Sequence, residues 1–437
     1  MTRLADDARA VLAANDRGGW TRPSPRLYPH QWSWDAGFVA MGWARIDPVR
    51  AVGELTHLFR GQWATGMVPQ IVFDPGVPDG AYEPGPDAWR TEGHAPAGVA
   101  TSGICQPPIH ALALHRVRAA ALGTPALAAV DAAIADLYPR LVAWHRWLRT
   151  ERDPSGSGLV TILHPWESGL DNSPRWDRAL TAVDPGSAED PLPRPDLTHV
   201  AHPTQRPTDG EYRRYRHLVD RLVAVDYDQA AALATHPFRM VDVWLSAILA
   251  AADDALADLA VIAGRPDAAG GHRADADRTR RALEGRWDPE LGLCTDLDAI
   301  TGESGAVATV AGFAPLVAGC APDRAAILVE QLVGPSFAGH PALAAPLPPS
   351  TSPGDPAFDP QGYWRGPQWP PITWLLWDGL RRLGHRRTAG GLRAAALAQL
   401  EAVGCCEYVH ATTGEALGSP SQSWTAAVAL DWLASEG

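Results

Sequence analysis

Helical segments recur along almost the whole of this 437-residue chain, and this pattern constrains its fold more than any other feature. Many stretches are rich in alanine and leucine and place apolar residues at a spacing of 3.6. The predicted helices cover residues 4–14, 48–60, 107–121, 125–149, 242–263, 275–286, 304–316, 323–332, 371–383, 389–402 and 423–434. The segments do not repeat in sequence, which argues against a solenoid. We therefore predict an all-α fold, an (α/α)6 barrel in which inner and outer helices alternate.

Strand patterns are short, and long loops separate several helices. We expect a strand at residues 159–163 and hairpins at 294–300 and 406–416. A proline-rich polar stretch, 184–209, is too long for a plain connection. We predict one catalytic domain over residues 1–437, with a cap or lid at 172–234 inserted between barrel helices.

Composition excludes several classes of partner. The net charge is −13 and no basic run occurs, so nucleic acid and anionic membranes are not expected partners. The N-terminus lacks a secretory apolar region and no apolar run could span a bilayer, which predicts a cytoplasmic protein. The five cysteines fit neither a disulfide framework nor a zinc site, and we expect no metal or cofactor.

Tryptophan is unusually common, with 18 Trp against 8 Tyr and 7 Phe. Many of these tryptophans have polar neighbours along the chain, whereas a core tryptophan usually has aliphatic ones. Aromatic rings suit the apolar faces of sugars, so a sugar-binding cavity is one interpretation and core packing is the other.

The segment HPWESGLDNSPRWD, residues 164–177, places Asp171 between two tryptophans. An apolar setting raises the pKa of a carboxyl, so Asp171 is a candidate general acid; the alternative is a turn aspartate that caps its own backbone. Glu167 and Asp177 could pair with Arg175 in a structural network.

A second acidic and aromatic cluster lies near the C-terminus. Glu407, which precedes Tyr408, is a candidate catalytic base, and its alternative is a glutamate at a strand edge. Glu415 follows a turn glycine, so we expect it to face solvent. Two carboxyls in aromatic surroundings are what cleavage of a glycosidic bond requires, because one protonates the leaving oxygen and the other activates water.

Other segments offer substrate-binding side chains. Asp35 lies beside Trp32 and Trp34, and could bind sugar hydroxyls or cap a helix beginning near Gly37. Gln106 could bind a ligand or cap a helix. The rigid aromatic segment 363–371 is expected to form a cavity wall that includes Tyr363, Trp364 and Trp369. Arg206 and Tyr212 fall in the predicted cap, where an arginine could bind a carboxylate or simply face solvent.

Four motifs together resemble glycoside hydrolase family 63, and within it the bacterial glucosylglycerate and mannosylglycerate hydrolases. They are YPHQWSWDAGF, WESGLDNSPRWD, YWRGPQWPP and EY…TGEALG…SWTAA, which run from residue 28 to residue 427. The resemblance implies an (α/α)6 barrel with a cap, inversion at the anomeric carbon, and Asp171 and Glu407 as acid and base. It also implies a sugar site and a glycerate site; their residues are Tyr28, Trp32, Asp35, Gln106, Trp364, Trp369 and Gln422 for the sugar, and Arg206 and Tyr212 for the glycerate carboxylate.

Two residues depart from the family pattern as we expect it. Gln368 stands where an aliphatic residue is expected, and Gln70 stands where a histidine is expected. Gln70 lies in a loop that could touch substrate, so this difference bears on which substrate is cleaved rather than on the chemistry.

The predicted function is therefore inverting hydrolysis of an α-glucosyl or α-mannosyl conjugate, foremost glucosylglycerate or mannosylglycerate. An alternative is a neutral α-glucoside such as trehalose or a short α-gluco-oligosaccharide. From other classes, an isoprenoid cyclase would need an aspartate cluster that this chain lacks, an epimerase would need paired histidines, and a non-catalytic sugar-binding protein could use the same aromatics. The sequence leaves gluco- or manno-specificity open, and a homo-oligomer is possible.

Overall fold

The computed structural model describes residues 3–186 and 193–435. Six helices pack in a closed ring, in which each contacts the next and the last contacts the first. They are α2 (Ser33–Trp43), α5 (His110–Ala121), α10 (Val243–Ile262), α12 (Ala314–Ala318), α14 (Pro370–Arg382) and α16 (Ser423–Ala434). Every residue of α2 is buried, which is expected of a helix that is apolar on all sides.

Six further helices cover the inner ring from outside, each against one or two inner helices. They are α1 (Arg3–Asn15), α3 (Pro48–Leu58), α6 (Leu127–Glu151), α11 (Ala269–Glu284), α13 (Pro322–Val333) and α15 (Arg386–Val403). The amphipathic α3 begins at an Asp47 N-cap followed by Pro48, as predicted. The molecule is thus an (α/α)6 barrel, which confirms the predicted fold class.

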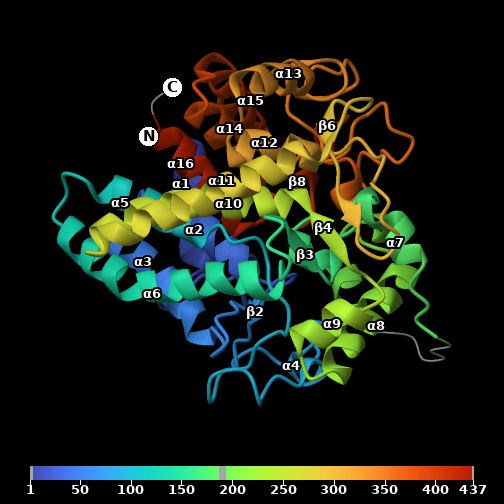
Figure 1. Ribbon diagram of the computed structural model, residues 1–437. Helices are drawn as coiled ribbons and strands as arrows, with labels where there is room; N and C mark the ends of the chain where they lie inside the picture. Colours follow the sequence, from blue (N-terminus) through green and yellow to red (C-terminus); the bar gives the residue numbers. More distant parts are fainter. Residues whose placement is uncertain (1–2, 187–192, 436–437) are drawn as a thin grey trace.

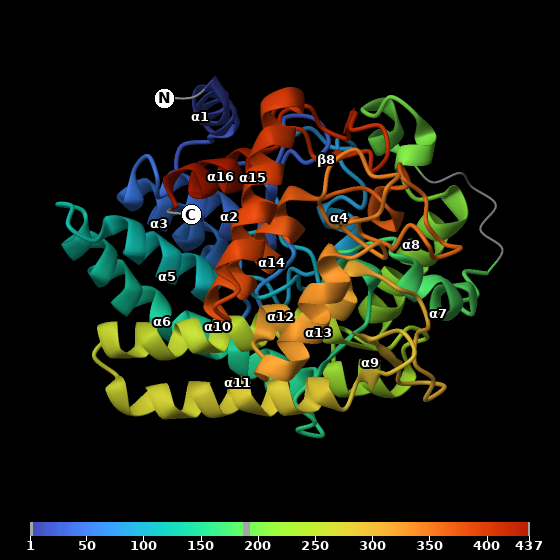
Figure 2. The same cartoon turned by 90° about the horizontal axis from the view of Figure 1, so that it is seen from above.

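Short strands and small helices lie at one end of the barrel, on the right in Figures 1 and 2. There β3 (Val160–Ile162), β4 (Met240–Asp242) and β7 (Leu297–Asp298) form one small antiparallel sheet. The other pairs are β1 (Gln31–Trp32) with β2 (Ile71–Val72), β5 (Trp287–Asp288) with β6 (Leu293–Cys294), and β8 (Tyr408–Val409) with β9 (Ala416–Leu417). The expected hairpin at 406–416 is present, but the one at 294–300 is wrong, because β6 and β7 pair with other strands.

One predicted helix, 304–316, is also wrong. Only α12 and the short helix η7 (Val310–Phe313) form there, because Pro315 has no backbone N–H to donate and is tolerated only in the first turn of α12. A methyl group at Gly312 would meet Leu293 at 2.7 Å, so this glycine lets the chain pass close to β6.

Segment 172–234 contains α7 (Asp177–Thr181), α8 (Asp209–Ala224) and α9 (Gln229–Thr235) together with 3-10 turns. Of the predicted cap, residues 187–192 lie outside the described residues. Helix α8 begins with a capping box, in which Thr208 and Glu211 exchange hydrogen bonds. In Figures 1 and 2, α7 and α8 lie at the same end of the barrel as β8.

Candidate active site

A pocket lies among the loops that connect the barrel helices to the short strands. Its walls combine aromatic rings with carboxyl, amide and guanidinium groups. The lining residues are Tyr28, Trp32, Trp34, Asp35, Gln70, Tyr82, Gln106, Trp166, Gly169, Asp171, Arg206, Pro207, Tyr212, Tyr363, Trp364, Gln422 and Trp424. Eleven of the thirteen residues predicted for the site therefore meet in one cavity.

The start of α2 forms one wall of this pocket. The residue before the helix is Trp32, which offers no side-chain cap, so the backbone N–H of Ser33 donates to Gln70 O and that of Trp34 to Gln106 Oε1. Asp35 is the third residue of the helix, and the alternative that it caps a helix near Gly37 is wrong. Gln106 lines the pocket and accepts from the start of α2, but it does not cap α5 (His110–Ala121), the helix that follows it, which has no side-chain cap.

Asp171 lies in the loop between two 3-10 helices, η2 (Pro165–Ser168) and η3 (Pro174–Trp176). Gly169 turns the chain with φ +73°, and a methyl group there would meet the Trp34 ring at 2.9 Å. Below the turn, the indole N–H of Trp176 donates to Leu170 O at 3.1 Å. These contacts hold the loop close to α2, where Asp171 lines the pocket.

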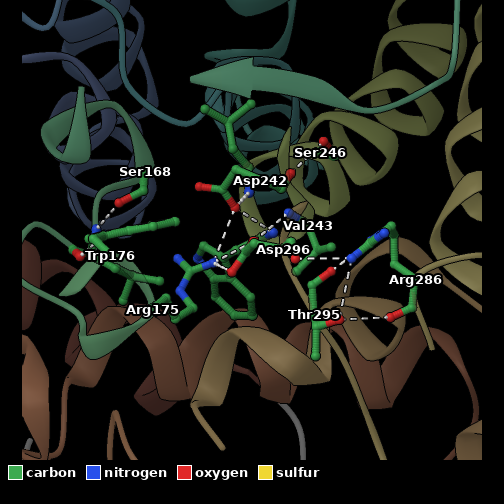
Figure 3. A network of polar contacts seen from close by, with 12 residues as sticks. Ser168, Arg175, Trp176, Asp242, Val243, Ser246, Arg286, Thr295 and Asp296 are labelled. Carbon is green, nitrogen blue, oxygen red and sulfur yellow. Dashed lines mark hydrogen bonds and ion pairs between the residues drawn. The ribbon is translucent and has the colours of Figure 1, made fainter. Parts of the chain in front are cut away.

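Arg175 joins this loop to the start of α10, as Figure 3 shows. Its Nη1 contacts both oxygens of Asp296 at 2.9 and 2.8 Å and lies 3.4 Å from Asp242 Oδ1. The guanidinium also stacks on the ring of Trp176 at 4.1 Å. Asp242 in turn caps α10 through the backbone N–H of Trp244. The Asp171 loop is thus anchored to the barrel by a buried ionic network.

The expected partners of Arg175 are wrong. Glu167 binds Arg152 with two hydrogen bonds of 2.8 Å, and Asp177 binds Arg365 instead. A structural role remains correct for Glu167, because its carboxylate also accepts from the backbone N–H of Leu163. Sequence spacing suggested local pairs, but each of these acids meets an arginine from a more distant part of the chain.

Glu407 precedes β8 and is fully buried. Its backbone pairs with Ser419 after β9, and the Ser419 N–H donates to Glu407 Oε2 at 3.0 Å. Its other oxygen, Oε1, accepts from the Tyr28 hydroxyl at 2.7 Å. Gly418, at φ +68°, leaves room for this carboxylate, since a methyl group there would lie 2.2 Å from Oε2. Glu415 is exposed, as expected, and accepts a hydrogen bond from the Thr413 hydroxyl.

The two carboxyls differ in their electrostatic surroundings. Burial raises the pKa of Asp171 to about 7, an effect that Arg206 opposes and the negative charge of Glu407 increases. Burial also raises the pKa of Glu407, but Arg206 and the hydrogen bonds from Tyr28 and Ser419 lower it. Asp35 has a strongly raised pKa, through burial and then through Glu407. Arg206 therefore lowers the pKa of two of these three carboxyls, Asp171 and Glu407.

Arg206 and Tyr212, both from segment 172–234, line the pocket. Arg206 is buried, with Nε 3.3 Å from Asp196 Oδ2 and Nη1 2.7 Å from the Tyr28 hydroxyl. It is therefore not a surface arginine, which was the alternative interpretation. Tyr212 is also buried, and the guanidinium of Arg194 lies 3.9 Å from the centre of its ring.

Two predicted residues do not line the cavity. Trp369 lies behind Trp364, with the two rings stacked at 3.5 Å, and Glu407 lies one hydrogen bond behind Tyr28. Tyr82 and Trp424 line the pocket but were not predicted for it. Trp424 belongs to the SWTAA motif near the C-terminus, whereas Tyr82 stands outside all four motifs. Gln70 was noted as a departure and does reach the pocket, while Gln368 is buried and bonds Ala345 O and Leu347 O.

Several buried polar atoms around the pocket have no protein partner among the described residues. They include both side-chain polar atoms of Gln422, Oε1 of Gln70 and the indole N–H of Trp364. A buried polar group without a partner costs about 1–3 kcal/mol. These atoms are therefore suited to a polar ligand rich in hydroxyl groups.

Residues 3–186 and 193–435 contain no group of three His, Cys, Asp or Glu side chains that could hold a metal ion. Within the same ranges, no helix is long and apolar enough to cross a membrane.

The helical barrel, the aromatic pocket and its carboxyls define a class, the carbohydrate-cleaving enzymes built on an (α/α)6 barrel. Comparison with known proteins narrows this class. The model of the mannosylglycerate hydrolase MGH1-like glycoside hydrolase domain matches residues 28–425, and the chain belongs to this family. It is therefore a glycoside hydrolase.

Individual relatives match over nearly their whole length. A glucosylglycerate hydrolase of Mycolicibacterium hassiacum is 43% identical over 99% of this chain and 98% of its own. A mannosylglycerate hydrolase of Thermus thermophilus is 41% identical over 97% of this chain and 98% of its own. A crystal structure of a GH63 mannosylglycerate hydrolase from Thermus thermophilus, in complex with Tris and D-glycerate, has a TM-score of 0.90 and 39% identity. That match covers 98% of this chain and 100% of the other.

Proposed function

We propose that this protein hydrolyses the α-glycosidic bond between a hexose and glycerate, with inversion at the anomeric carbon. The observation that supports this proposal most is the position of two carboxyl groups. Asp171, whose pKa is raised to about 7, lines the aromatic pocket, and Glu407 lies directly behind Tyr28 of its lining, where it accepts two hydrogen bonds and has Arg206 nearby. Inversion requires an acid that still carries its proton and a base that can accept one, and Arg206 and the two hydrogen bonds to Glu407 oppose the rise in its pKa that burial causes.

In the proposed reaction, Asp171 donates its proton to the glycosidic oxygen as the bond from that oxygen to the anomeric carbon breaks. A water molecule attacks the anomeric carbon from the opposite face, and Glu407 accepts the proton that this water loses. The glycerate leaves with its hydroxyl restored, and the hexose is released as the β-anomer. Inversion predicts that the two carboxyl groups lie roughly 6.5–9.5 Å apart, with room for the water.

The hexose is expected to lie against the wall formed by α2 and the segment around Trp364. Trp32 and Trp34 offer aromatic faces to the ring, and Asp35 offers a carboxyl to its hydroxyls. The Gln422 amide, which has no partner among the described residues, would gain partners from the same hydroxyls. Binding of sugar would thus satisfy polar atoms that the fold leaves unpaired.

The aglycone is assigned from charge and from the relatives. Arg206 is the sole lysine or arginine among the described residues that line the pocket, and its guanidinium suits a carboxylate. The relatives named above are hydrolases of glucosylglycerate and mannosylglycerate, and one was crystallised with D-glycerate. Tyr212 and Tyr82 line the same pocket and would enclose the glycerate. We further propose that segment 172–234, which supplies Arg206 and Tyr212, serves as the cap of the single catalytic domain.

The proposal is tested by incubating the purified protein with α-glucosylglycerate, α-mannosylglycerate and trehalose, each separately. The anomeric proton is followed by NMR from the first minutes. We expect initial release of β-glucose or β-mannose from a glycerate conjugate, and the preferred conjugate identifies the hexose. Cleavage of trehalose alone, or initial release of the α-anomer, would contradict the proposal.

A further inference from the structure

The Tyr28 hydroxyl links Arg206 to the buried Glu407, and all of its hydrogen-bonding capacity is used within the protein. It donates its single hydrogen to Glu407 Oε1 at 2.7 Å and accepts one from Arg206 Nη1 at 2.7 Å. The Tyr363 hydroxyl lies 2.9 Å away and supplies the remaining hydrogen bond. A hydroxyl has one hydrogen and two lone pairs, so Tyr28 has no capacity left for a sugar. Its hydroxyl positions Glu407 instead.

The guanidinium of Arg206 forms hydrogen bonds to the protein with only some of its nitrogens. Its Nε and Nη1 contact Asp196 and Tyr28, while the described residues provide no hydrogen-bond acceptor for Nη2. Its Nη1 also lies 3.9 Å from Glu407 Oε1, so the cation faces the buried carboxylate directly as well as through Tyr28. An anion that binds this guanidinium from the pocket would therefore compete with Glu407 for the same positive charge.

Arg206 also acts on Asp171. Its charge opposes the rise in the pKa of Asp171 that burial causes, just as it opposes that of Glu407. A positive charge within about 4–6 Å lowers the pKa of a carboxyl by roughly 1–3 units. If a ligand neutralised this cation, both carboxyls would hold their protons more firmly.

We propose that the carboxylate of the substrate, by pairing with Arg206, strengthens Glu407 as a base and keeps Asp171 protonated, so that an anionic aglycone takes part in catalysis as well as in binding. This inference rests on the proposed function, because it takes glycerate as the anion. The substrate would thus change the pKa of both catalytic carboxyls in the complex, whereas in the free enzyme the charge of Arg206 opposes the rise in the pKa of Glu407 that burial causes.

Other ionisable groups also face Glu407 and are the same for every substrate. They lie in the segment before β1, on α2, in the loop around Asp171, in the segment around Tyr363, and in or just before β8. These groups are Tyr28, Asp35, Asp171, Tyr363, Cys406 and Tyr408. None of these groups is a second cation, so Arg206, 3.9 Å from Glu407 Oε1, is the group near Glu407 with which a carboxylate on the aglycone would pair.

The decisive experiment compares two substrates that differ in one charge, α-glucosylglycerate and α-glucosylglycerol. The dependence of kcat on pH is measured for each, since kcat reports the ionisations of the enzyme–substrate complex. We expect both the acidic and the alkaline limb to lie about one pH unit higher with the glycerate conjugate. In the Arg206→Met variant the two profiles should coincide. Equal limbs for both substrates in the wild-type protein would overturn the inference.

A measurement without turnover separates this inference from the proposed function. D-glycerate is titrated into the protein at pH 7 in buffers of different ionisation enthalpy, and proton uptake is calculated from the heats. We expect uptake by the wild-type protein and much less by Asp171→Asn, because Asp171 is the group that titrates near pH 7. Binding without uptake, or no binding, would overturn the coupling even if the conjugates are hydrolysed. Failure to hydrolyse either conjugate would overturn the proposed function alone.

Discussion

Asp171 and Glu407 lie in two loops that support their carboxyl groups in opposite ways. No other described residue donates a hydrogen bond to the side chain of Asp171; the contacts of its loop are made by neighbouring residues such as Trp176 and Arg175. Glu407 receives a hydrogen bond on each oxygen. A buried carboxyl without donors retains its proton, and one with donors and a nearby cation loses it more easily. The same residue chemistry thus yields an acid and a base.

The largest expected effect comes from removing the proton donor. Asp171→Asn should lower kcat for a glycerate conjugate by about 10²–10⁴-fold, the usual contribution of a general acid, with little change in KM. Asp177→Asn is the matched control, because Asp177 lies in the same region but forms an ion pair near the surface with Arg365. Steady-state kinetics of both variants test this. An Asp171→Asn protein that retains more than a tenth of wild-type kcat would rule out the assignment.

The second largest effect is expected from breaking the ion pairs of Arg175 that anchor the Asp171 loop. Arg175→Leu leaves Asp242 and Asp296 buried without their cation, and loss of one partner from a buried ion pair costs about 3–5 kcal/mol. Urea unfolding should show this loss in the free energy of unfolding. Arg178→Leu is the control, since Arg178 pairs with Glu303 at the surface, where such pairs contribute at most about 1 kcal/mol. Equal stability of the two variants would mean that the network does not hold the loop.

A substitution at Gly418 tests how the loop around Glu407 holds its carboxylate. Gly418→Ala places a methyl group 2.2 Å from Glu407 Oε2, so the carboxylate must move. We expect kcat to fall by about 10–100-fold, because small displacements of catalytic groups have effects of that size. Gly404→Ala, at φ +77° with open space around it, carries the same backbone strain without the clash. If both variants lose activity equally, strain rather than displacement of Glu407 is responsible.

The smallest expected effect is the change of kcat/KM with pH in the wild-type protein, which tests the difference between the two carboxyls without a substitution. Asp171 must be protonated to act as an acid, and its pKa in the free enzyme is about 7. Activity should therefore be retained below this value and fall about tenfold per pH unit above it. On the acidic side activity should fall as Glu407 becomes protonated. A profile that stays flat to about pH 9 would contradict the acid role of Asp171.

Local patterns in the sequence predicted the barrel well. The helix at 423–434 has the predicted boundaries, and the acidic clusters around Asp171 and Glu407 meet in one region because the fold gathers their loops at one end. The partners of Arg175 were not predictable, since Asp242 and Asp296 lie 67 and 121 residues away. The pairing of β7 with β4 escaped prediction for the same reason, as strand pairing depends on the tertiary fold.

Direct titration of Asp171 tests the central claim. Carboxyl carbons of aspartate, labelled with ¹³C, are followed by NMR across the acidic and neutral pH range in the wild-type protein and in Asp171→Asn, and the resonance missing from the variant is assigned to Asp171. The structure predicts a midpoint at about pH 7. A midpoint near about 4, the ordinary value for aspartate, would show that Asp171 is ionised at neutrality and contradict its role as the proton donor.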